Sequence, residues 1–179
     1  MGAHESMEHA EHAEHASGSN KKIALLIAVI ALFLALSETL GKGAQTEAIS
    51  KNVEASNLWS FFQAKTIRKT TMETAAEHMD IDVQLAKDPA VKQLLADRVG
   101  KWKARAATYE SEPKADGKGE GRKELMARAL AAEKKRDLSM AKYHHFEVSS
   151  AAFQIAIVVA SAFAITGMIY LMWFAGGLA

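Results

Sequence analysis

Two long stretches without charge constrain this chain more than any other feature. Residues 23–36 read IALLIAVIALFLAL, fourteen apolar residues in succession, and residues 151–179 contain no charged side chain. Every Lys and Arg except Lys21 and Lys22 lies between the two stretches. An ordinary soluble globule does not segregate its charges in this way, so the sequence predicts two helices that cross a membrane.

The first stretch has two interpretations. Extension to Gly41 gives nineteen residues, or ~28 Å of helix, which is close to the ~30 Å hydrocarbon core and includes Glu38 near its end. We therefore predict a first transmembrane helix over residues 21–41. A cleaved signal peptide, with Lys21 and Lys22 as its basic region, is the alternative. The four Glu and four His that precede these lysines favour a retained anchor.

The second stretch predicts a transmembrane helix over residues 151–175. Tyr170 and Trp173 near its end suit the belt of aromatic side chains at a membrane interface. A buried helix of a soluble protein is the alternative, but only the first stretch would be apolar enough to cover it. Basic residues near the membrane are more numerous in the middle of the chain, so we place that part in the cytoplasm and both termini outside.

The sequence between the two stretches predicts helices alone. Good helix formers dominate residues 42–150, and the alternation typical of strands is missing. Asp88 and Pro89 predict an N-cap and a first helical turn, whereas residues 112–121 predict an exposed linker. The predicted fold is all-α, a membrane helical hairpin whose two transmembrane helices are joined by a long coiled-coil-like helical domain with breaks near 88–89 and 112–121.

Apolar seams predict how these helices pack. A heptad seam on the first helix, with spacings of four and three, comprises Ala44, Ala48, Lys51, Ala55, Leu58, Phe62, Lys65, Lys69, Met72, Ala76, Met79 and Val83. A mostly polar row beside it comprises Gln45, Ile49, Asn52, Ser56, Trp59, Gln63, Thr66 and Thr70. The second helix presents Val91, Leu95, Val99, Trp102, Ala106 and Tyr109. The third is predicted to present Ala127, Ala131, Leu138, Ala141, His145 and Val148.

Four polar residues lie where the two predicted transmembrane helices reach the cytoplasmic side, namely Ser37, Glu38, Ser150 and Gln154. A carboxylate that faces hydrocarbon is costly, so Glu38 should face the bundle, water or headgroups. In one interpretation Glu38 reaches the interface and is solvated there. In the other it meets Gln154 or Ser150, in its own or a neighbouring subunit, and forms a polar ring about an oligomer axis.

Leu58, Trp59 and Phe62 are candidate contact residues for a homo-oligomer. A long hairpin with thin seams buries little apolar surface as a monomer, so self-association would bury more. A cluster of aromatic and basic side chains on this helix also suits an anionic lipid or a nucleic acid, and it comprises Trp59, Phe61, Phe62, Lys65, Arg68 and Lys69. The net charge of +1 gives no case for nucleic acid, and the ~30 Å to the membrane edge argues against lipid. A packed helix–helix contact is therefore our interpretation of this cluster.

Residues 1–20 are predicted to form an acidic, His-rich tail. His9, His12 and His15 recur every third residue beside glutamates, and these side chains suit zinc, nickel or copper. The simpler interpretation is a solvated tail that binds divalent metal only adventitiously. Since the chain has no Cys and no H-E-x-x-H motif, we expect no cofactor and no metalloprotease site.

Three segments resemble a known family. They are NLWSFFQAKTIRKT at 57–70, KKRD at 134–137 and YHHFEVSSAAFQIAIVVAS at 143–161. The chain resembles, over about residues 20–175, a bacterial family of small membrane proteins known only as domain of unknown function 4337. The resemblance implies the bacterial inner membrane, an N-terminal span, a coiled-coil-like middle and C-terminal spans, often one more than in this chain. It supplies no catalytic residues.

We therefore expect a non-enzymatic, self-associating inner-membrane protein whose helical hairpin acts as a scaffold or interaction module. Its expected partners are the lipid bilayer and further copies of the chain, and no nucleic acid. The alternative is a subunit of an oligomeric ion channel or transporter whose polar helix row lines an aqueous path. An enzyme ranks third, because no acid–base pair or nucleophile stands out in the sequence.

Overall fold

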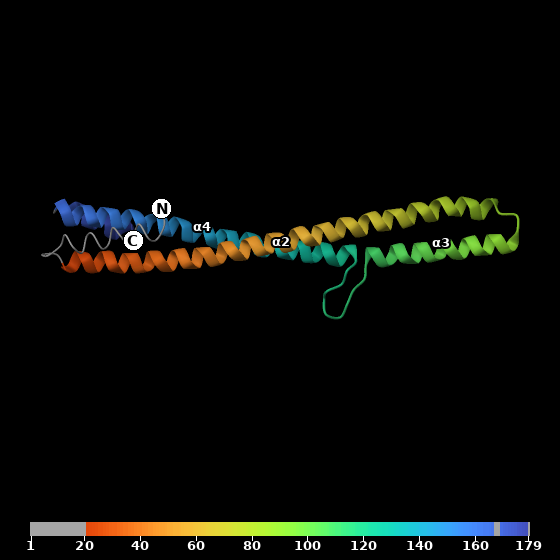
Figure 1. Ribbon diagram of the computed structural model, residues 1–179, viewed down its shortest axis with the longest axis horizontal. Helices are drawn as coiled ribbons and strands as arrows, with labels where there is room; N and C mark the ends of the chain where they lie inside the picture. Colours follow the sequence, from red (N-terminus) through yellow and green to blue (C-terminus); the bar gives the residue numbers. More distant parts are fainter. Residues whose placement is uncertain (1–20, 167–168, 179) are drawn as a thin grey trace. The chain divides into compact units, whose positions relative to one another are not determined.

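The computed structural model describes residues 21–166 and 169–178, and these residues form helices without a strand among them. The elements are α2 (Lys21–Leu85), α3 (Pro89–Glu110), α4 (Arg122–Thr166) and α5 (Ile169–Leu178) (Figure 1). They fall into two compact units, a terminal unit (Met1–Ile49 with Asp137–Ala179) and a central unit (Ser50–Arg136). The expected all-α fold is confirmed for the described residues.

Both predicted interruptions of the middle region are present. Asp88 has the extended backbone of an N-cap, and its carboxylate accepts hydrogen bonds from the backbone N–H of Ala90 at 2.7 Å and of Val91 at 3.3 Å. Pro89 occupies the first turn of α3, where its missing N–H costs nothing. The second interruption lies between α3 and α4, at residues 111–121.

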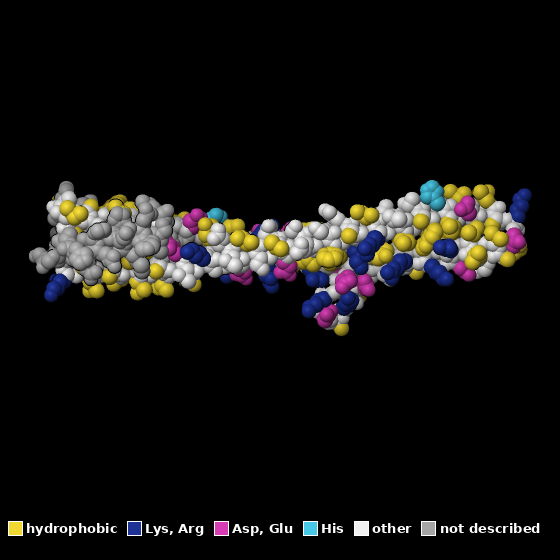
Figure 2. Space-filling view, in the orientation of Figure 1, with side chains coloured by type: hydrophobic (Ala, Val, Ile, Leu, Met, Phe, Trp, Pro, Cys, Tyr) yellow, Lys and Arg dark blue, Asp and Glu magenta, His cyan; other side chains and the backbone are white. Residues whose placement is uncertain are grey.

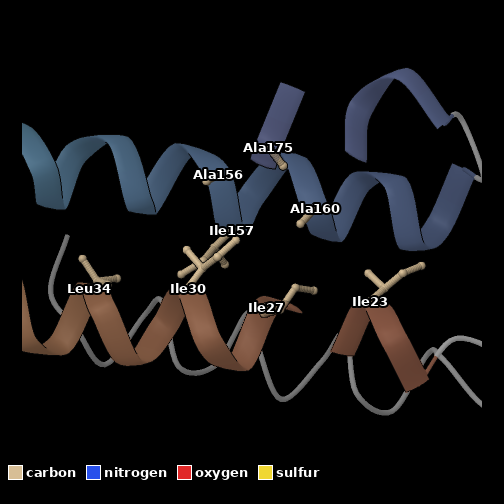
Figure 3. Close-up of a cluster of buried hydrophobic side chains, with 8 residues drawn as sticks. All are labelled: Ile23, Ile27, Ile30, Leu34, Ala156, Ile157, Ala160 and Ala175. Atoms are coloured by element: carbon tan, nitrogen blue, oxygen red, sulfur yellow. The ribbon is translucent and has the colours of Figure 1, made fainter. Parts of the chain in front are cut away.

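The terminal unit is held together by one apolar cluster. Its members from α2 recur at spacings of four, three and four residues, and they point toward small side chains of α4 and α5 (Figure 3). Alanine at the facing positions lets the helix backbones approach closely, as in many membrane helix pairs. The buried members are Ile23, Ile27, Ile30, Leu34, Ala156, Ile157, Ala160 and Ala175.

The second apolar stretch is divided between two helices. A single helix over residues 151–175 was expected, whereas α4 ends at Thr166 and α5 begins at Ile169. Ala175 of α5 is fully buried in the cluster that also contains Ala156 and Ala160 of α4.

The predicted heptad seam of α2 is the face with which this helix packs inside the chain. All twelve of its residues are buried or half-buried. In the central unit, Ala55 and Leu58 join a cluster with Leu125, Ala129 and Ala132 of α4. Farther along α2, its segment up to Leu85 runs beside α3 (Figure 1).

The structure turns the apolar side of α4 that the sequence indicates outward, and a different side of the helix packs. Its six residues, from Ala127 to Val148, are all exposed. The face that packs contains Leu125, Ala129 and Ala132 instead, followed by Ser139. Alanines occur on both sides of α4, so the choice between the two sides depends on which one meets the seam of α2.

Candidate functional site

Among residues 21–166 and 169–178, two helices are long and apolar enough to cross a membrane, namely α2 and α4. Their apolar stretches also turn large side chains outward (Figure 2). Leu25 is 66% exposed and Ile165 is 77% exposed, and α5 adds an exposed Trp173. In water such a continuous apolar exterior is unfavourable.

The structure brings Glu38 and Gln154 together. The side-chain amide of Gln154 donates a hydrogen bond to Glu38 Oε1 at 3.4 Å, from α4 to α2 within one chain. Ser37 and Ser150 lie beside this pair and are buried. All four polar residues predicted at the ends of the transmembrane helices therefore share one location. The ring about an oligomer axis stays a prediction.

A cavity of about 360 Å³ surrounds this polar pair, and it was not foreseen from the sequence. Helices α2 and α4 approach closely beside it, because a Cβ added to Gly41 would lie 3.3 Å from Cβ of Phe146. The chemistry of its wall is mixed, with two carboxylates, one ammonium group, two amides and three hydroxyls. The lining comprises Ser37, Glu38, Gly41, Lys42, Gln45, Tyr143, Phe146, Glu147, Ser150, Ala151 and Gln154.

Leu58, Trp59 and Phe62, the predicted oligomer contacts, have partners inside the chain. Leu58 is buried, and the two aromatic side chains pack against the cluster around it. The indole N–H of Trp59 donates a hydrogen bond to Glu133 Oε1 at 2.9 Å, and its ring meets that of Phe62 edge-on at 5.4 Å. Trp59 and Phe62 thus pack against α4 within the chain, whereas Phe61, the third aromatic side chain of the cluster, is exposed. The role of these residues between copies stays a prediction.

A polar network joins the three helices of the central unit. Arg122 donates hydrogen bonds to Glu110 Oε2 at 2.7 Å and to Thr66 Oγ1 at 2.9 Å, and its guanidinium lies 4.9 Å from the centre of the Phe62 ring. Lys69 also contacts Glu110, at 3.3 Å. Burial raises the pKa of Glu110, but the hydrogen bonds from Lys69 and Arg122 outweigh it and hold the pKa below its usual value.

The linker between α3 and α4 is tied back to the start of α4. Glu124 accepts a hydrogen bond from the Ser111 hydroxyl at 2.6 Å and one from the backbone N–H of Glu112 at 3.2 Å. The Ser111 hydrogen bond holds the pKa of Glu124 below its usual value, against the effect of burial. A Cβ at Gly121 would lie 2.4 Å from the Glu112 nitrogen, so the close approach requires glycine. Charged side chains of both signs gather over this linker (Figure 2).

A second heptad row on α2 is turned outward, and the sequence reasoning missed it. Its spacings alternate between four and three over ten positions, and every one of its residues is exposed. Five of the ten are Val, Ile or Thr, and the row ends with Leu85, which is 72% exposed. We call these residues the outer row of α2: Val53, Asn57, Ser60, Ala64, Ile67, Thr71, Thr74, His78, Ile81 and Leu85.

The predicted metal ligands His9, His12 and His15 lie outside the described residues. Within residues 21–166 and 169–178, no group of three or more His, Asp or Glu side chains is arranged to hold a metal ion. The adventitious metal predicted for the tail therefore stays a prediction.

Comparison with known proteins gives one match. Residues 19–179 match the family described as Domain of unknown function (DUF4337). No curated protein and no solved structure matches the chain.

Proposed function

The chain belongs to the family Domain of unknown function (DUF4337), and from that premise we propose that it is a non-enzymatic membrane protein that self-associates through the outer row of α2 and serves as a scaffold. The family description assigns no activity. The side chains that each unit turns outward are the groups that any partner meets first.

The terminal unit supports insertion into a lipid bilayer. Helix α2 carries no charge but Glu38 between Lys22 and Lys42, a distance of ~30 Å along the helix axis. Helix α4 carries none from Val148 to Thr166, or ~28 Å. Less than a third of each apolar window is buried inside the chain, 28% in α2 and 22% in α4. A core helix of a soluble protein would be mostly buried, whereas a bilayer covers such a surface.

We place the protein in a bacterial inner membrane, with the central unit in the cytoplasm. The family resemblance supports the membrane, and the basic residues near the membrane ends of the middle region support the orientation. Labelling of introduced cysteines tests this, since the chain has none. Lys118→Cys should be shielded from a membrane-impermeant maleimide in intact spheroplasts, and Ser6→Cys should be labelled. The reverse pattern would contradict the orientation.

The single observation that carries self-association is the exposed outer row of α2. A heptad repeat sustained from residue 53 to residue 85 spans ~48 Å and is the pattern by which one helix recognises another. Inside the chain α2 packs with its other heptad face, and every residue of the outer row is exposed. Ile67, Thr71 and Thr74 also line a shallow groove on this row.

A second copy of the chain fits this row better than an unrelated helix does. Copies inserted in one membrane share one orientation, so their α2 helices are parallel and equivalent positions face each other. Confinement to the membrane also raises the effective concentration of a copy. Asn57 and His78 at core positions of the row weaken the pairing but select one register, as polar core residues do in coiled coils.

The test is the mass of the full-length protein in mild detergent. Ile67→Lys combined with Ile81→Lys should convert the oligomer to a monomer, because charges would enter the contact unpaired. Both side chains are exposed within one copy, so the fold of the chain should not suffer. Leu130→Lys, an exposed position on α4, is the matched control and should leave the mass unchanged. An unchanged mass in the double variant would contradict the proposal.

A subunit of an ion channel is the second candidate, and the contact between Glu38 and Gln154 favours it. A carboxylate at the depth of the bilayer is costly and therefore often marks an ion path. The polar row of α2 from Gln45 to Thr70 would line the path in this reading. Conductance of reconstituted bilayers that disappears in Glu38→Gln would support the channel. If the parent protein gives no conductance in reconstituted bilayers, the channel is excluded.

A further inference from the structure

We propose that the cavity between α2 and α4 in the terminal unit binds the headgroup of a phosphatidylethanolamine lipid. The cavity measures about 360 Å³, which is within the range of small-molecule sites. The inference rests on the membrane insertion proposed above and is independent of self-association.

The position of the cavity along the helices fits a lipid headgroup. The apolar cluster of Figure 3 ends at Leu34 on α2 and at Ala156 on α4. The lining residues come next along both helices, with Glu38 one turn beyond Leu34 and Gln154 just before Ala156. Lys42 is the first charged residue after this part of α2. The cavity thus lies where hydrocarbon gives way to headgroups.

The two signs of charge in the wall match a zwitterion. The Glu38 carboxylate receives one hydrogen bond, from Gln154, and retains further acceptor positions for the N–H donors of a primary ammonium group. Among the described residues, Lys42 Nζ has no hydrogen-bond or ion-pair partner, so it is available for a phosphate. The Glu147 carboxylate already has two contacts within the chain. It accepts a hydrogen bond from the Tyr143 hydroxyl at 3.3 Å and contacts His144 Nδ1 at 3.2 Å.

Hydrogen bonding distinguishes the ethanolamine headgroup from the other common ones. A choline group has no N–H to donate to Glu38. A glycerol headgroup leaves the lipid with a net negative charge that Glu38 and Glu147 repel. The acyl chains of the bound lipid would lie along exposed apolar side chains near the cavity, such as Leu36, Leu40 and Val148.

The test measures lipid binding to the full chain by native mass spectrometry in detergent. The probes are dioleoyl phosphatidylethanolamine, the matching phosphatidylcholine and phosphatidylglycerol, and soluble glycerophosphoethanolamine. We expect the ethanolamine lipid to bind about tenfold more tightly than the other three, the effect of about one charge-assisted hydrogen bond. Glu38→Gln and Lys42→Gln should each remove this preference.

Glu47→Gln is the matched control, since Glu47 lies on the same helix outside the cavity and its contact with Ser139 tolerates an amide. It should keep the preference. Equal binding of the three lipids, a preference that survives Glu38→Gln, or soluble glycerophosphoethanolamine binding as tightly as the lipid would each overturn the inference. Recovery of the protein in vesicles, checked by flotation, separates such a failure from a failure of membrane insertion itself.

Discussion

The terminal and central units both contain parts of α2 and α4, but different side chains hold the two units together. In the terminal unit, isoleucine and leucine of α2 pack against alanine of α4 and α5, and large apolar side chains also cover the outside. In the central unit the buried cluster is thin, and polar contacts such as Trp59 to Glu133 and Arg122 to Glu110 join the helices around it. In the bilayer that we propose for it, burial gives no hydrophobic advantage, so the first unit would depend on close packing.

The central unit must draw its stability from a smaller set of apolar contacts. Its helices meet through alanines, and the few larger side chains buried among them supply most of the area removed from water. Half-buried ion pairs then fix the three helices relative to one another. Because the buried cluster is small, single substitutions in it should be costly.

The largest effect should follow from Leu125→Ala, since Leu125 is buried in the cluster of the central unit. We expect the free energy of unfolding in urea, measured by circular dichroism on the full chain in detergent, to fall by about 2–4 kcal/mol. Leu130→Ala removes the same atoms from an exposed position of α4 and should change it by less than about 0.5 kcal/mol. Equal losses in the two variants would show that the cluster does not stabilise the unit.

A smaller effect is expected for Arg122→Met, which keeps much of the side-chain volume but removes the donors to Glu110 and Thr66. Charge-assisted hydrogen bonds at a half-buried site contribute roughly 1–2 kcal/mol after solvent screening. The same urea titration measures this loss. Lys118→Met, at an exposed position of the linker, is the control. A variant as stable as the parent would mean that the network orients the helices without stabilising them.

Acid should weaken the central unit. The pKa values of Glu110 and Glu124 are lowered in the fold, so their contribution is present above the ordinary glutamate pKa of about 4.3 and is lost as the pH falls below it. We expect the urea midpoint of the parent to decline below about pH 4.3, and to decline less in Glu124→Gln. The same pH dependence in both proteins would contradict this assignment.

Much of the fold could be read from the sequence because the signals were local. Asp88 and Pro89 define a helix start by their own chemistry, and the heptad seam of α2 holds enough large side chains, such as Leu58 and Phe62, to mark one face. The sequence predicts that the polar residues around Glu38 lie together, because both predicted transmembrane helices become polar at the same end. The closeness of Glu38 and Gln154 follows from that register.

The remaining features depend on contacts between distant residues. Alanines on opposite sides of α4 are nearly equivalent locally, so Ala127 and Ala129 could be told apart only by where α2 lies. Likewise the outer row of α2 is mostly polar in sequence, and only the structure shows that its Ile67 and Ile81 are exposed. The division of the second apolar stretch after Thr166 is another such feature, because it depends on the packing of Ala175 of α5 in the same cluster as alanines of α4.

Crosslinking in the native membrane tests the central claim most directly, that the outer row of α2 meets the same row of a second copy. The chain has no cysteine, so Ile67→Cys introduces a single thiol at a core position of the row. Under mild oxidation we predict a disulfide-linked dimer, because equivalent core positions of parallel helices approach within disulfide range. Glu77→Cys, which is exposed but turned about 100° away from its neighbour His78 in the row, should stay monomeric. A dimer from Glu77→Cys and none from Ile67→Cys would contradict the account.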